Sequence, residues 1–190
     1  QEGLKQYGPS KEHRPNPIVE MGLFMDYSGI PLAFCIHPGN TNEQTTLIPL
    51  EEQIMKDFSL ARFIVCTDAG LSSETNRKFN NFGGRCFITT QSIKKLKKAE
   101  REWCLAPTGW HLKDTTDVYD IRKLEDTEEN RKKIFYKQLF VEGNDGKREI
   151  DFDQTLIVTY SLKYRDYQRD IRNQQVQRAL KTVEKDPKKT

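Results

Sequence analysis

An aspartate directly after an apolar segment is the residue of this sequence best placed to do chemistry. Residues 63–67, Phe-Ile-Val-Cys-Thr, predict a buried strand, and Asp68 follows at once. A carboxylate at the carboxyl end of a central strand lies where open α/β sheets bind ligands. Such oxygens suit Mg²⁺, and a pair of these ions can drive phosphodiester displacement. Asp68 can equally cap the turn into a helix at Ser72, so its residue type leaves both roles open.

Few other residues in the first half offer chemistry. Asp26 ends an apolar segment too, but it lies in a predicted hairpin turn, where aspartate is common for conformational reasons. If it joined Asp68, the pair would make a self-contained metal-dependent nuclease. The four cysteines and three histidines have no zinc-type spacing, and the cysteines are predicted to be buried free thiols. Phosphate-binding loops, dinucleotide fingerprints and Ser or Cys nucleophile motifs do not occur in the sequence.

Two basic segments could contact a nucleic-acid backbone. One is the loop "SKEHRPNP", and the other is the lysine-rich segment that begins after residue 93. Side chains of this kind bind phosphates without reading base sequence, although solvated surface is an equally simple explanation. The net charge of +3 is too small to decide between them. The candidate DNA contacts are Lys11, His13, Arg14, Lys94, Lys95, Lys97 and Lys98.

The pattern of apolar residues predicts the elements that must position Asp68. Strands at 18–25 and 31–36 form an antiparallel hairpin around a turn. A helix follows, with Leu47, Leu50, Ile54 and Phe58 on one face, after a cap at Thr41 or Asn42. The strand at 62–67 is apolar on both faces, which predicts a central place in a sheet covered on both sides. A short helix capped by Ser72 or Ser73 and a strand at 86–89 complete an α/β layout with a mixed sheet.

The second half of the sequence has a different pattern of apolar and charged residues. We expect a basic helix at 91–104, strands at 134–141 and 147–160 around a tight turn, and a basic helix from 160 to 183. The predicted domains are therefore residues 1–92 and residues 93–190. No apolar run reaches the length of about 18 residues that a membrane-spanning helix needs.

Several motifs together resemble those of one known family. They are "YGPSKEHRPNPIVEMGLFMDYSGIPLAF", "HPGNTNE", "FIVCTDAGLSS", "GGRCFITTQS" and, later, "SLKYRDYQRDIRNQQVQRA". The chain is similar in these to DDE-type transposases of bacterial insertion sequences, in the branch whose ribonuclease H-like core carries a β-rich insertion. The similarity covers nearly all of the chain. It implies that residues 1–92 are part of the ribonuclease H-like core, with its mixed sheet and flanking helices, and that residues 93–190 are the insertion subdomain.

The resemblance also implies an activity and its partners. Members cleave and join the ends of the element by metal-dependent phosphodiester transfer, using two aspartates and a glutamate that bind two Mg²⁺ (or Mn²⁺) ions. Asp68 matches the second aspartate. The implied partners are double-stranded DNA, as the inverted repeats of the element and as target DNA, and further copies of the same protein. The implied location is the bacterial cytoplasm, in association with the nucleoid.

The sequence departs from the family pattern at both ends of the chain. We find no aspartate on a strand before Tyr7, and no helix with the family's glutamate after the insertion. We therefore expect a central fragment that lacks the first core strand and the last catalytic helix, leaves a sheet edge unpaired, and does not cleave DNA alone. Whether the chain is an enzyme stays open on these grounds. The alternative is a non-catalytic DNA-binding module or a structural remnant of a decayed element.

Overall fold

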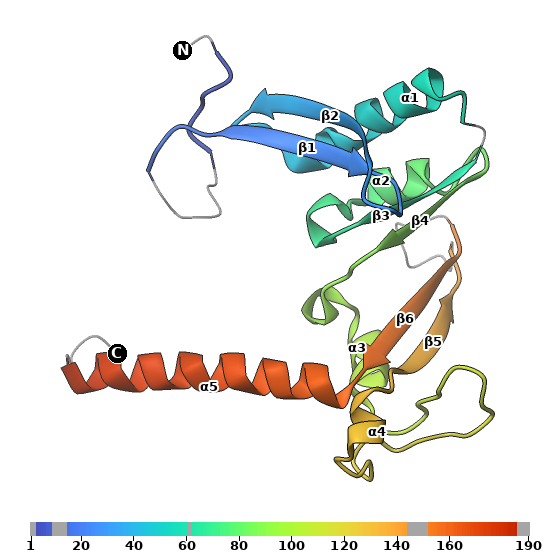
Figure 1. The fold of residues 1–190 in the computed structure, drawn as a ribbon, viewed down its shortest axis with the longest axis vertical. Coiled ribbons are helices and arrows are strands. Elements are labelled where there is room, and N and C mark those ends of the chain that lie inside the picture. The colour runs from blue at the N-terminus through green and yellow to red at the C-terminus, as the bar shows by residue number, and fades with distance from the viewer. Residues whose placement is uncertain (1–2, 9–14, 61, 144–151, 186–190) are drawn as a thin grey trace. The chain divides into compact units, whose positions relative to one another are not determined.

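The chain folds as a mixed α/β protein with two compact units. The computed structural model describes residues 3–8, 15–60, 62–143 and 152–185. Along the chain, the boundary between the two units falls after Lys95, close to the predicted boundary after residue 92. Within the described ranges the strands form three separate two-stranded sheets, two in the first unit and one in the second (Figure 1). None of the helices in these ranges combines the length and the apolarity needed to cross a bilayer.

An antiparallel hairpin opens the first unit, as predicted. Strand β1 (Val19–Met25) pairs with β2 (Pro31–Pro38), and the turn between them is held by Asp26. The Asp26 carboxylate oxygen Oδ1 accepts hydrogen bonds from the backbone amides of Ser28 at 2.8 Å and Ile30 at 2.9 Å. The predicted conformational role of Asp26 is therefore confirmed.

The hairpin leads into the helix that packs against it. A short 3-10 helix η1 (Glu43–Thr45) starts where the Asn42 side chain accepts the Gln44 amide at 3.1 Å. Asn42 therefore caps η1 and not the helix that follows, which begins after Thr46 without a side-chain cap, so the predicted cap is corrected. Helix α1 (Leu47–Asp57) follows and packs against β2. Leu47 and Ile54 of the predicted apolar face are buried, but Phe58 is 49% exposed because the helix has ended there.

A parallel strand pair carries the candidate site. Strand β3 (Phe63–Thr67) pairs with β4 (Arg85–Thr89), and η2 (Ala69–Leu71) and α2 (Glu74–Phe79) connect them. The Ser73 hydroxyl accepts the Asn76 amide at 3.2 Å, so Ser73 is the cap of α2.

Burial of this strand pair differs from the sequence prediction. Val65 is buried on one face, but the other face is open, with Ile64 64% and Ile88 63% exposed. Cys66 and Cys86 lie exposed on that face too, so the prediction of cover on both sides and of buried thiols is wrong here. An apolar strand is buried on both faces only where a second layer covers it, and the described residues cover one face.

A buried carboxyl joins α1 to α2 in the first unit. Glu51 is 0% exposed, and the Asn80 side-chain amide donates to both of its oxygens, at 3.0 and 2.8 Å. Burial raises the pKa of Glu51 to about 7, although the Asn80 hydrogen bond and the charge of Arg85 act to lower it. The folded state therefore binds the Glu51 proton more tightly than the unfolded chain, where the ordinary pKa is 4.5.

We expect this carboxyl to make the stability of the first unit depend on pH. Its contribution is fully present below about pH 4.5 and is lost as pH rises through about 7. Relative to Glu51→Gln, the free energy of unfolding of the wild type should fall by about 2–3 kcal/mol across that window. Chemical denaturation at several pH values, followed by far-UV circular dichroism, measures it.

The neighbouring exposed Glu52 provides the control on the same helix. Glu52→Gln should retain the wild-type pH dependence. Equal pH profiles for the wild type and Glu51→Gln would contradict the assignment.

The second unit contains a small antiparallel sheet and its helices. These elements are α3 (Lys98–Leu105), α4 (Glu128–Arg131), β5 (Phe135–Val141), β6 (Gln154–Tyr160) and α5 (Leu162–Lys185). The predicted helix 91–104 is corrected, because η3 (Ile93–Lys95) is separate and Lys97 has extended backbone, with ψ at 154°. Residues 144–151, which hold most of the predicted turn, lie outside the described residues.

A buried lysine organises the core of the second unit. Lys137 is 3% exposed, and its ammonium donates to the carbonyl oxygens of Trp103 at 2.5 Å and Ala106 at 2.9 Å. It also lies over the rings of Trp103 and Trp110, at 4.9 and 4.5 Å. Burial lowers the pKa of Lys137. The lysine thus donates hydrogen bonds to carbonyl oxygens at the end of α3 that have no partner within the helix. The faces of the two aromatic rings take the place of the water that the ammonium loses on burial.

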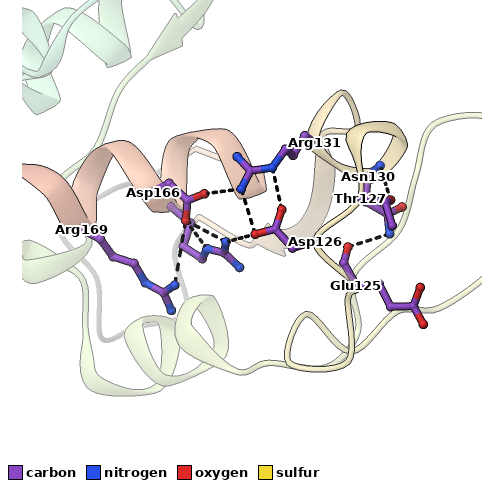
Figure 2. A network of polar contacts seen from close by, with 8 residues as sticks. Glu125, Asp126, Thr127, Asn130, Arg131, Asp166 and Arg169 are labelled. Atoms are coloured by element: carbon purple, nitrogen blue, oxygen red, sulfur yellow. Dashed lines mark hydrogen bonds and ion pairs between the residues drawn. The ribbon is translucent and has the colours of Figure 1, made fainter.

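A network of ion pairs joins α4 to the start of α5 (Figure 2). Arg131 contacts Asp126 at 2.6 Å and Asp166 at 3.1 Å. Arg165 contacts the same two carboxylates, at 3.0 and 2.7 Å. Hydrogen bonding from Arg165 lowers the pKa of Asp166. Single surface pairs stabilise little, but a network that shares its members holds the start of α5 against the segment that includes α4.

Candidate functional site

Asp68 lies at the carboxyl end of β3, as the sequence predicts. The ends of the two parallel strands are tied together by hydroxyls, because Thr67 Oγ1 donates to Thr89 Oγ1 at 3.0 Å. Thr89 Oγ1 in turn donates to the carbonyl oxygen of Asp68 at 3.2 Å. The backbone that carries the Asp68 side chain is therefore anchored to both strands of the pair.

The Asp68 carboxylate is exposed and has a local structural role. Its Oδ1 accepts the Gly70 amide at 2.8 Å, which caps η2. The capping role that the sequence left open is thus present. Capping engages one oxygen of an exposed carboxylate, so this role and metal binding are compatible chemically.

A second carboxylate lies beside the same turn. A Cβ atom placed on Gly70 would lie 2.9 Å from Asp68 Oδ1 and 3.1 Å from Glu43 Oε2. The first contact is closer than real Cβ atoms come and the second is tight, so a larger residue at position 70 would push at least one of the two carboxylates aside. Glu43 was missed by sequence reasoning. The signal was its place at the end of "HPGNTNE", one residue after the Asn42 cap.

Gln44 fixes the turn that carries Asp68. Its side-chain amide donates to the Gly70 carbonyl oxygen, and its Oε1 accepts the Ser73 amide at 2.8 Å. Asn76, which is 2% exposed, donates to the carbonyl oxygens of Gln44 and Leu71, at 3.0 Å each. The two amide side chains therefore hold the turn at Gly70, Leu71 and Ser73. Nothing in the residue type of Gln44 indicated this role, because its partners lie 26 and 29 residues away in the chain.

The predicted DNA contacts are only partly described. Lys11, His13 and Arg14 lie outside the described residues. The four lysines Lys94, Lys95, Lys97 and Lys98 are all exposed, but they do not form the face of one helix. Two of them belong to η3, Lys97 precedes α3, and Lys98 begins it with a long ion pair to Glu102 at 3.9 Å. The chain also divides into its two units within this run, after Lys95.

The donor set at the turn fits a hard cation only in part. Asp68 and Glu43 supply the carboxylate oxygens that Mg²⁺ prefers. Among the described residues, however, no group of three or more His, Cys, Asp or Glu side chains is arranged to hold a metal ion. Comparison with known proteins adds no further site residue, because no family model, no curated protein and no solved structure matches this chain.

We expect Gln44→Ala to loosen the turn that carries Asp68. The substitution leaves the half-buried partners at Gly70 and Ser73 without their side-chain hydrogen bonds, which typically costs about 1–3 kcal/mol. Chemical denaturation should show that loss, and amide hydrogen exchange at residues 70–76 should be faster. Gln53→Ala, on the exposed face of α1, is the control. Equal losses in the two variants would contradict the role of Gln44.

Proposed function

We propose that this chain is part of a DNA transposase that cleaves and joins insertion-sequence ends by metal-dependent phosphodiester transfer, and that it is inactive alone. One observation carries the proposal. Asp68, the residue that matches a catalytic aspartate of the family, is an exposed carboxylate at the carboxyl end of a parallel strand; its Oδ1 accepts one backbone amide and its carbonyl oxygen accepts the Thr89 hydroxyl.

We propose further that the first unit is an incomplete ribonuclease H-like core. The order of its elements supports this, with an antiparallel hairpin, a helix, and then a parallel strand pair. Within the described residues β1 pairs only with β2, and β3 pairs only with β4. One added strand that paired with β1 and with β3 would unite the two pairs in a single mixed sheet. We assign that place to the first core strand.

The metal requirement follows from the chemistry of the reaction. Bound Mg²⁺ or Mn²⁺ would activate the attacking oxygen and stabilise the leaving one. Asp68 would hold the ion, with the Glu43 carboxylate beside the same glycine. Two carboxylates at one turn are too few to fix a pair of ions at the separation the reaction needs. For this reason we propose that the chain alone does not cut DNA.

The proposed partner is double-stranded DNA, bound through the phosphate backbone. The exposed lysines Lys94, Lys95, Lys97 and Lys98 supply the positive charge for this contact among the described residues. A protein of this class acts at the nucleoid in the bacterial cytoplasm, as an assembly of several copies. The alternative proposal, a non-catalytic DNA-binding or structural remnant, is favoured by the small number of carboxylates at the turn.

DNA binding and DNA cleavage together test these proposals. We expect duplex DNA to bind in a salt-dependent manner, measured by fluorescence anisotropy between about 50 and 200 mM salt. Changing the four lysines to glutamine should weaken binding and reduce the salt slope by about 3–4. The same change at four other exposed lysines, Lys56, Lys113, Lys123 and Lys132, is the matched control. Equal effects of the two sets would overturn the assigned contact.

A plasmid-nicking assay with Mg²⁺ or Mn²⁺ tests whether Asp68 belongs to a complete active site. We expect no nicking by this chain. Metal-dependent nicking that disappears in Asp68→Ala would show a complete active site and overturn the proposed inactivity. DNA binding that is unchanged by Asp68→Ala and by chelation, without cleavage, is the expected behaviour of both the fragment and the remnant. A chain that neither binds nor cuts DNA would overturn the function proposed here.

A further inference from the structure

A set of buried polar side chains links α1 to the turn that follows β3. Glu51 of α1 is fully buried, and the side-chain amide of Asn80, at the end of α2, donates to both of its oxygens. One helical turn earlier, Asn76 donates its own side-chain amide to the carbonyl oxygens of Gln44 and Leu71. We call the side chains of Glu51, Asn80 and Asn76 the Glu51 cluster.

Two oxygens of the Glu51 cluster are buried acceptors without a donor. They are the side-chain oxygens of Asn76 and Asn80, which are 2% and 1% exposed, and among the described residues neither accepts a hydrogen bond. A buried acceptor of this kind costs free energy and requires an explanation. Glu51 is the member of the cluster that can supply the missing donor, because a protonated carboxyl carries an O–H group.

The charge of Glu51 decides which side of the Asn80 amide can face it. An ionised carboxyl only accepts hydrogen bonds, so Asn80 must present its NH₂ group, as it does in the structure. A neutral carboxyl can donate to Asn80 Oδ1 instead, if the amide rotates by half a turn and brings that oxygen to the place of its nitrogen, 2.8 Å from Oε2. The NH₂ group then faces the other way, where the side-chain oxygen of Asn76, four residues earlier on α2, can accept it.

We propose that the proton on Glu51 is a switch that sets how firmly the turn carrying Asp68 is held. With the proton in place, hydrogen bonds run in one direction from Glu51 through Asn80 to Asn76, and from there to the two backbone carbonyl oxygens that Asn76 binds. Bonds in such a series strengthen one another in a buried site. Loss of the proton turns the Asn80 amide round, and Asn76 then holds the turn without a donor to its own oxygen.

The direction of the switch follows from burial. Burial raises the pKa of Glu51 to about 7, against the Asn80 hydrogen bond and the charge of Arg85, which both act to lower it. The neutral form therefore predominates in the folded state below about pH 7, and the hold on the turn weakens as the pH rises through that value. Arg85 acts through its charge, because its guanidinium donates to the carbonyl oxygen of Phe79.

Other titratable side chains lie on the elements that pack against α1. β2 contributes His37 on its half-buried face, η1 contributes Glu43, and α2 contributes Glu74, Arg77 and Lys78. Histidine is the side chain that ordinarily changes its charge between pH 5 and 8. His37 is therefore the group whose titration has to be separated from that of Glu51.

Nuclear magnetic resonance of the isotope-labelled chain tests the switch. A titration from about pH 5.5 to 8.5 lies above the usual range of exposed carboxyl groups. We expect the side-chain carboxyl of Glu51, the side-chain amides of Asn76 and Asn80, and the backbone amides of Gly70 and Ser73 to change with one shared midpoint near 7. The ring signals of His37, followed in the same titration, give its own midpoint.

Amide hydrogen exchange measures how firmly the turn is held. Relative to the intrinsic rate at each pH, exchange at Gly70 and Ser73 should be at least about fivefold faster at the upper end of the range than at the lower end. Amides of the β1/β2 pair, in the same unit, are the internal reference. Glu51→Gln carries a permanent NH₂ donor, so its turn should stay protected throughout. Glu52→Gln, exposed on the same helix, should behave like the wild type.

Each outcome decides the matter. A midpoint shared with Glu51 and a local loss of protection, both absent from Glu51→Gln, support the switch. Turn amides that follow the His37 ring, or that still respond in Glu51→Gln, overturn it. Side-chain amides that stay unchanged overturn it too, and so does an equal loss of protection in the β1/β2 pair, which shows general destabilisation. If Glu51→Gln does not fold, the wild-type titration alone decides. None of these measurements involves DNA, so their result is independent of the proposed transposase function.

Discussion

A two-stranded sheet cannot stabilise itself, and this constraint governs the whole chain. Each of the three sheets formed by the described residues has two strands and two faces, of which one is more buried than the other. In the first unit, buried polar contacts between the connecting elements add to the stability that the small sheets lack. Asn80 reaches Glu51 across α1 and α2, and Gln44 and Asn76 hold the turn after β3. The second unit compensates with Lys137, which links β5 to the end of α3.

The same constraint explains the surfaces that remain open. The faces of β1/β2 and β3/β4 that the helices do not cover expose Met21, Phe34, Ile64 and Ile88. Along β1 and β3 the outer edges have no partner strand within the described residues, although Ile18, just before β1, exchanges two backbone hydrogen bonds with Gln6. Apolar faces and free edges are what strands present when a sheet lacks neighbours.

The candidate site illustrates how a short turn acquires a defined geometry. Asp68 caps η2 through Gly70, while Thr89 fixes its backbone and Gln44 fixes the residues that follow. Glycine at position 70 allows Glu43 and Asp68 to approach the same space. Each contact is an ordinary hydrogen bond or a steric allowance, and together they hold a carboxylate at the end of a strand, where its chemistry can be used.

The sequence by itself determined the local structure. Apolar runs around a turn predicted the hairpin, helical spacing predicted α1, Ser73 was one of two residues predicted to cap α2, and the end-of-strand position of Asp68 could be read directly. Such features depend on residues within one or two turns of each other. The tertiary structure alone decided which faces are covered, why Cys66 and Cys86 are exposed, and that Lys97 interrupts the predicted basic helix. It also brought Glu43, Gln44 and Glu51 to partners more than 25 residues away. Burial and long-range polar contacts depend on which elements meet, and residue types at neighbouring positions carry no information about that.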